Sequence, residues 1–261
     1  MNLEAVVPLV VVSMMIIVGT EISRAPLMAS LRMPGALLGG TLAQWLLLPL
    51  LVAASPDGAL SNTYCSVGRL HVAFSVALTA VLGFVALAAM PLLLAAIGPA
   101  ALGVEAVGVP IAEVGLRLLL FLLLPFGIGM TLRHFFPAAL ERHFRAIHAA
   151  GLSLLALLLA LVFLNQRRAV LDLFWDSAQL TATFTGLALL AGWLSGSALR
   201  LNPTDRAVLA VEFGVRNVGI APVLALTTFR QQEFAAFGAL FVLLQAPLLL
   251  TVLLARERLN A

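Results

Sequence analysis

The stretch AVEFGVRNVGIAP, residues 210–222, is the most unusual part of this sequence. It places Glu212 and Arg216 among apolar and small residues, in a stretch that also holds two glycines and a proline. A charged side chain at the centre of a membrane costs about 2.5–3.5 kcal/mol on insertion scales. If this stretch lies in a membrane, something must offset that cost, and the offset is usually function.

Composition identifies the environment of the chain. Its 261 residues are 62% hydrophobic and 10% charged, with a mean hydropathy of +1.10. Because soluble domains carry about 25% charged residues, we expect an integral membrane protein. The net charge of +3 does not indicate nucleic-acid binding, since the arginines are scattered at segment ends. No HExxH, GxSxG or phosphate-loop motif is present, so we do not expect an enzyme.

A membrane-spanning helix needs about 20 mostly apolar residues. On that basis we expect an all-α polytopic fold, with residues 1–261 forming one membrane domain of nine elements. Their predicted ranges are 4–22, 34–53, 56–69, 71–97, 111–132, 147–165, 178–199, 204–230 and 233–255.

Two of these elements, 56–69 and 204–230, are predicted to be helices broken at membrane depth. The first is too polar for an ordinary span, and the second carries charges, glycines and a proline near its middle. They occupy corresponding places, each is followed by one full helix, and they run in opposite directions. The pattern predicts an inverted repeat of four plus five helices, and paired interrupted helices indicate a transporter site at the midplane.

The loop arginines predict the orientation, because cytoplasmic loops carry the excess of positive charge. One set of loops holds ten arginines and the other holds three. We therefore expect the N-terminus outside and the C-terminus in the cytoplasm, in a bacterial-type inner membrane. The ten are Arg24, Arg32, Arg69, Arg133, Arg142, Arg145, Arg200, Arg206, Arg256 and Arg258; the three are Arg167, Arg168 and Arg230.

Oxygen-bearing side chains gather at the two predicted breaks. Ser75 and Thr79 are four residues apart and share one helix face, while Ser61 and Asn62 lie at the first break. With Glu212 they form a hard-oxygen set that suits a small cation. Two alternatives stay open at this point: the hydroxyls bond to their own helices, and Glu212 forms a structural ion pair with Arg216.

These motifs resemble the bile acid:sodium symporter family. SPDGALSNTYCSVGRLHVAFSVALTAV (55–81) and VEFGVRNVGIA (211–221) are similar to its Ser-Asn and Glu-x-Gly-x-Gln-Asn motifs. MPGALLGGTLAQWLLLPLL (33–51) and LLPFGIGMTLRHFFP (123–137) are also similar. The resemblance covers nearly the whole chain and implies a nine-helix member that lacks the first helix. It also implies two crossing discontinuous helices in a core domain, with a panel domain beside it.

The resemblance implies roles for individual residues. Gln44 and the backbone around Glu212 match part of the second sodium site of the family. The glutamine of the family motif is replaced by Arg216, whose permanent charge would fill that site and leave at most one coupled sodium ion. Asn217, together with Arg216, is expected to contact substrate. The first sodium site is matched by Ser61, Asn62, Ser75, Thr79 and Glu212.

The sequence therefore predicts a secondary active transporter that imports a small organic anion with at most one sodium ion. The alternative is a sodium-independent transporter of the same fold, proton-coupled or facilitative. A more remote alternative is a membrane sensor that does not transport. The sequence gives no indication of the oligomeric state.

Overall fold

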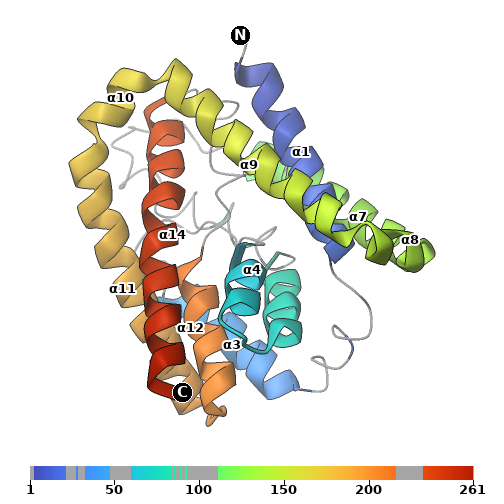
Figure 1. Cartoon of the computed structure of the whole chain (residues 1–261), viewed down its shortest axis with the longest axis vertical. Coiled ribbons are helices and arrows are strands. Elements are labelled where there is room, and N and C mark those ends of the chain that lie inside the picture. Colours follow the sequence, from blue (N-terminus) through green and yellow to red (C-terminus); the bar gives the residue numbers. More distant parts are fainter. Residues whose placement is uncertain are drawn as a thin grey trace.

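In the computed structural model of the chain, every regular element among the described residues is a helix. The structure describes residues 3–21, 33–47, 60–83, 111–215 and 232–260, together with the isolated positions 28, 85, 89 and 92. The expected all-helical class is therefore confirmed for this part of the chain. α1 begins at the upper end of the molecule and α14 ends at the lower end (Figure 1).

The helices follow one another with short connections wherever these connections are described. In order they are α1 (Leu3–Glu21), α3 (Pro34–Leu47), α4 (Leu60–Val67), a helix at 72–83, α6 (Ile111–Leu118), α7 (Leu124–Phe135), α8 (Pro137–Arg142), α9 (Phe144–Asn165), α10 (Arg167–Asp172), α11 (Phe174–Ala198), α12 (Pro203–Gly214) and α14 (Gln232–Asn260).

α6 and α7 are joined by a π-helical turn, Leu119–Leu123, so that they form one continuous rod. Pro125 follows this turn. Proline has no backbone N–H and crowds the carbonyl one turn earlier, and a wider π turn accommodates such a residue. The sequence pattern of 111–132 predicted the rod but gave no sign of its irregular turn.

One group of helices consists of α1, the α6–α7 rod and α9 (Figure 1). Its apolar core contains Val11, Met15 and Leu158. At Gly19 and Gly129 the backbones of α1 and α7 touch, because a Cβ at Gly129 would lie 2.8 Å from the Gly19 Cα. Small residues permit such close crossings of membrane helices, so α1 and α7 are packed backbone to backbone.

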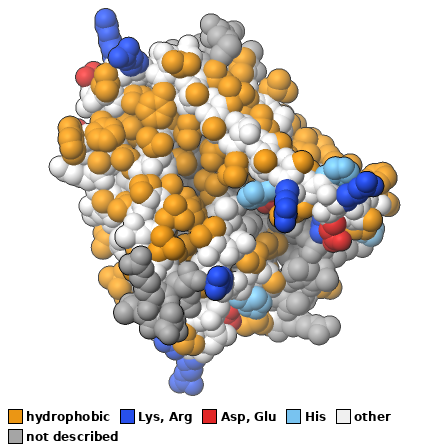
Figure 2. Space-filling model, in the orientation of Figure 1, with side chains coloured by type: hydrophobic (Ala, Val, Ile, Leu, Met, Phe, Trp, Pro, Cys, Tyr) orange, Lys and Arg blue, Asp and Glu red, His pale blue; other side chains and the backbone are white. Residues whose placement is uncertain are grey.

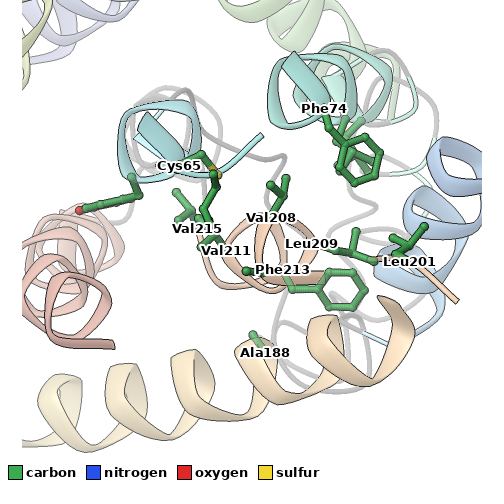
Figure 3. Packing of buried hydrophobic residues seen from close by; sticks show 14 of the residues in the cluster. Cys65, Phe74, Ala188, Leu201, Val208, Leu209, Val211, Phe213 and Val215 are labelled. Carbon is green, nitrogen blue, oxygen red and sulfur yellow. The ribbon is translucent and has the colours of Figure 1, made fainter. Parts of the chain in front are cut away.

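A second group surrounds α12. Figure 3 shows α12 enclosed by α3, α4, the 72–83 helix, α11 and α14. Its buried residues Val208, Leu209, Val211 and Phe213 belong to the largest apolar cluster of the described chain. α11 and α12 also touch through their backbones, since a Cβ at Gly192 would lie 2.6 Å from the Ala210 Cα.

One contact between the two groups is made by side chains. Val76 and Ala80 of the 72–83 helix pack against Phe126, with Val18 of α1 and Met130 of α7 beside them. We call this cluster the intergroup seam.

Three helices in the described part of the chain are long and apolar enough to cross a membrane: Ala112–Phe135, Phe144–Asn165 and Ala236–Ala255. Figure 2 shows hydrophobic side chains over the middle of one face and arginines at its ends. Outward-facing leucines such as Leu164, which is 79% exposed, suit contact with lipid tails. The protein is therefore a multi-pass membrane protein, while the count of nine elements stays a prediction.

The predicted ranges differ from the observed helices mainly at their ends. α9 and α11 begin earlier than predicted, at Phe144 and Phe174, and α14 continues to Asn260. The short helices α8 and α10 were not predicted, because their charged sequences lack the apolar run used to find spans. Parts of 34–53, 56–69, 71–97 and 204–230 lie outside the described residues.

Candidate functional site

The short helix α4 brings Ser61 and Asn62 into the interior, where their side chains are 0% and 8% exposed. Its end is closed by two backbone hydrogen bonds, from Leu70 N to Cys65 O at 2.8 Å and from Arg69 N to Ser66 O at 3.2 Å. This is the Schellman arrangement, and it requires the left-handed φ of 50° at Arg69. The chain then enters the 72–83 helix directly.

The 72–83 helix presents Ser75 and Thr79 on one face. The two residues are one helical turn apart, and both are buried, at 0% and 7% exposed. The hydrogen bonds of these hydroxyls go to the side chains of Asn62, Glu212 and Ser61 and not to the backbone of their own helix. The alternative in which they only bond to their own helix is therefore not what the structure shows.

α12 carries Glu212 to the same place. The helix starts at Asn202, whose side chain accepts a hydrogen bond from Asp205 N at 2.9 Å, with a proline in the first turn. It ends at Gly214, and Val215 is extended at φ −86° and ψ 130°. A predicted break in 204–230 thus corresponds to a helix end two residues after Glu212, which is fully buried.

The five side chains predicted to form the first cation site are in hydrogen-bond contact. The Ser75 hydroxyl lies 2.7 Å from Asn62 Oδ1 and also bonds to a carboxylate oxygen of Glu212. The Thr79 hydroxyl donates to the other carboxylate oxygen at 3.2 Å and lies 3.3 Å from Ser61 Oγ. Two consecutive helices, α4 and the 72–83 helix, therefore meet the distant helix α12 at one buried carboxylate.

The chemistry of this cluster is that of a site for a hard cation. All five side chains present oxygen, and the Ser75 hydroxyl has a single proton for two acceptor oxygens. A small cation would satisfy such crowded oxygens and offset the cost of a buried carboxylate. Among the described residues no three His, Cys, Asp or Glu side chains form a metal cluster, so the oxygen donors are hydroxyl, amide and carboxylate groups.

Gln44 on α3 is buried, at 2% exposed. Within the part of the chain that the structure describes, its Nε2 has no hydrogen-bond partner, and the same is true of Thr41 Oγ1 one turn earlier. A buried donor without an acceptor costs about 1–3 kcal/mol. Arg216 and Asn217, the other residues predicted for the second site and for substrate, lie outside the described residues.

Two polar contacts near the cluster were not predicted. Gln245 of α14 donates through Nε2 to Gly214 O at 2.5 Å, and the same nitrogen lies 3.3 Å from Thr185 Oγ1. A signal was available, since Gln245 interrupts the apolar run LFVLLQAPLLL, 240–250.

The second contact joins the beginnings of two helices. His71 Nδ1 lies 2.9 Å from Asp205 Oδ1, and Asn202 Nδ2 donates to Asp205 Oδ2 at 2.7 Å. Nothing in the sequence indicated that His71 and Asp205 are partners. A further ion pair lies within α6, where Arg117 Nε is 3.0 Å from Glu113 Oε1.

Comparison with known proteins gives one family. The model of the Sodium Bile acid symporter family matches residues 50–173. This range includes α4, the 72–83 helix and therefore four of the five oxygen-bearing residues described above. No curated protein matches the chain significantly.

The match agrees with the membrane helices of the structure and with the resemblance of the Ser-Asn motif. The members of the family are transporters and not enzymes. The match covers just under half of the chain and supports its resemblance to the sodium bile acid symporter family.

Proposed function

We propose that the protein is a secondary active transporter that imports a small organic anion together with at most one sodium ion. The sodium ion, as a co-substrate, would bind to Ser61, Asn62, Ser75, Thr79 and Glu212. The observation that carries this proposal is the convergence of hydroxyl, amide and carboxylate oxygens from three elements on one fully buried carboxylate. Near it α12 ends, and unwound backbone at such ends supplies carbonyl ligands for sodium in transporters.

The limit of one sodium ion rests on the sequence. Arg216 stands where the family motif has glutamine, two residues after the end of α12 at Gly214. A guanidinium group is permanently charged and cannot dissociate from the chain. It would therefore occupy the second site without contributing energy from a sodium gradient.

Alternating access would come from rocking of the two helix groups against each other. We propose that they correspond to a panel and a core within a single domain of nine membrane elements, arranged as an inverted repeat. Two features support rocking: each group has its own backbone-to-backbone glycine crossing, and the intergroup seam is made by side chains. Packed groups of this kind move as units while their contacts slide or open.

We propose that the substrate binds beside the broken end of α12, near Asn217 and Arg216. Arginine recognises carboxylates through paired hydrogen bonds, which is why an organic anion is the expected class. The unpartnered amide nitrogen of Gln44 is a further donor in the same helix group. The proposed location is a bacterial-type inner membrane with the C-terminus in the cytoplasm.

The test is the thermal stability of the purified protein in sodium against potassium. We expect sodium to stabilise the wild type, Glu212→Ala to abolish this effect, and Arg216→Gln to give a steeper dependence on sodium. A transport assay that finds two sodium ions moved per substrate would refute the limit of one.

The same experiment separates the alternative function. If sodium stabilises neither the wild type nor Arg216→Gln, the protein is a sodium-independent transporter in which Arg216 provides the fixed positive charge. A membrane sensor would bind a ligand without moving it, so uptake into liposomes distinguishes that third possibility.

A further inference from the structure

We propose that Gln245 is a positioning residue that closes the broken end of α12 and thereby sets the cation affinity of the Glu212 cluster. This inference rests on the proposed function, because it concerns the same cation site. It begins with the bond from Gln245 Nε2 to Gly214 O, 2.5 Å long and buried between α14 and α12.

The carbonyl at Gly214 needs a donor. The last four carbonyls of an α-helix have no amide partner within it, and α12 ends at this residue. Val215 N still bonds back to Val211 O at 2.9 Å. This backbone hydrogen bond does not involve the Gly214 oxygen. A carbonyl without a hydrogen-bond donor in a membrane interior costs several kcal/mol.

A neutral amide is the appropriate donor at this position. The C-terminal end of a helix carries a partial negative charge, which a lysine or arginine would also satisfy. A positive side chain here, two residues from Glu212, would compete with a cation at the carboxylate. Gln245 supplies the N–H without charge, and it is 3% exposed, so water cannot replace it.

The bond also fixes Glu212 relative to its oxygen partners. Gln245 connects α14 to α12, and its second contact, Thr185 Oγ1 at 3.3 Å, belongs to α11. Leu249 of α14 packs beside Gly214 one turn further on, since its Cδ2 lies 3.7 Å from the position of a Cβ there. Two helices, α11 and α14, thus hold the end of α12, while Ser75 and Thr79 approach Glu212 from a third.

The test compares Gln245→Leu with Gln166→Leu in the full-length purified protein. Gln166 is a matched control: it is also buried, at 6% exposed, and its side-chain amide has no hydrogen-bond partner among the described residues. The first measurement is the sodium concentration that gives half of the maximal thermal stabilisation. We expect Gln245→Leu to raise it about tenfold, a factor equivalent to about 1.4 kcal/mol, and Gln166→Leu to leave it unchanged.

The second measurement does not depend on sodium. Cys65 is the single cysteine of the chain, and it is fully buried in α4 beside Val211 and Val215 (Figure 3). Its rate of labelling by a maleimide therefore reports the opening of this region. We expect faster labelling in Gln245→Leu and the wild-type rate in Gln166→Leu. If the leucine variant does not fold, Gln245→Asn, whose amide is one methylene shorter, is used with the same expectations.

The outcomes separate this inference from the proposed function. A Gln245 variant that loses stability equally in sodium and potassium, with the wild-type sodium midpoint and labelling rate, would show a structural role only and overturn the inference. A wild type without any sodium stabilisation would refute the proposed function. In that case, faster labelling of Cys65 in Gln245→Leu alone still supports the positioning role. Equal labelling rates in Gln245→Leu, Gln166→Leu and the wild type overturn it.

Discussion

His71 and Asp205, separated by 134 positions in the sequence, are joined at 2.9 Å between Nδ1 and Oδ1. The contact connects the start of the 72–83 helix to the first turn of α12. The same two helices meet again at Ser75 and Glu212, one turn further along the 72–83 helix and two turns further along α12. A line of polar contacts therefore holds these helices in register from their beginnings to the carboxylate.

This pairing predicts unequal effects for its two members. Asp205 is buried and also accepts from Asn202 Nδ2, whereas the His71 side chain is 45% exposed. Asp205→Ala would remove the acceptor of two hydrogen bonds, each contributing about 0.5–1.5 kcal/mol, and should lower the melting temperature clearly. His71→Ala should cost less than about 1 kcal/mol. Equal losses for both variants would contradict this account.

Thr79→Val tests the hydroxyl contacts of the oxygen cluster with little change in shape. It removes the bond to Glu212 at 3.2 Å and the contact with Ser61 at 3.3 Å. Because a hydrogen bond contributes about 1 kcal/mol, the sodium midpoint should rise roughly fivefold. The control is Thr251→Val, whose hydroxyl bonds to Pro247 O of its own helix. A midpoint that moves equally in both variants would argue against Thr79 as a ligand.

Two glycines of α11 should respond in opposite ways to alanine. At Gly192 a Cβ would lie 2.6 Å from the Leu209 oxygen and from the Ala210 Cα, so Gly192→Ala must push α12 away. At Gly186 nothing lies within 4 Å, and Gly186→Ala should gain up to about 1 kcal/mol from helix propensity. Melting temperatures of the two variants provide the comparison; a stable Gly192→Ala protein would show that α11 and α12 can separate freely.

Arg200 has the left-handed φ of 54°, at the end of α11 where Leu201 N bonds to Gly196 O at 2.9 Å. A side chain in this conformation costs about 1 kcal/mol relative to glycine. Arg200→Gly should therefore be more stable than Arg200→Ala by about that amount, although both lose the same charge. If the alanine variant is equally stable, the turn does not hold this residue in the left-handed region.

The sequence predicted those features of the site that depend on residues close together in the chain. The Ser75–Thr79 spacing and the isolated Glu212 are local patterns, so the cluster could be assembled from them before its contacts were seen. The partner of His71 could not be predicted, because nothing local relates residue 71 to residue 205. The π-helical turn at Leu119–Leu123 was missed for another reason: an apolar run does not encode hydrogen-bond spacing.

Gln245 represents an intermediate case. Its polarity within an apolar run was visible in the sequence, but its meaning depends on the position at which α12 ends. That position was predicted only as a break somewhere within 204–230. Isolated polar residues in membrane helices therefore become interpretable once the helix ends around them are known.

The intergroup seam and the oxygen cluster share a single helix. Val76 and Ala80, which touch the other group, directly follow Ser75 and Thr79 along the chain. One peptide bond thus separates each residue that touches the neighbouring group from one that bonds within the cluster. If the first helix group moved, the contacts of Val76 and Ala80 would change, and the adjacent hydroxyls of Ser75 and Thr79 would shift with them. Conversely, movement of these hydroxyls toward a bound ion would change the contacts at the intergroup seam. The helix at 72–83 is therefore the part of the described chain that contributes to both the seam and the oxygen cluster.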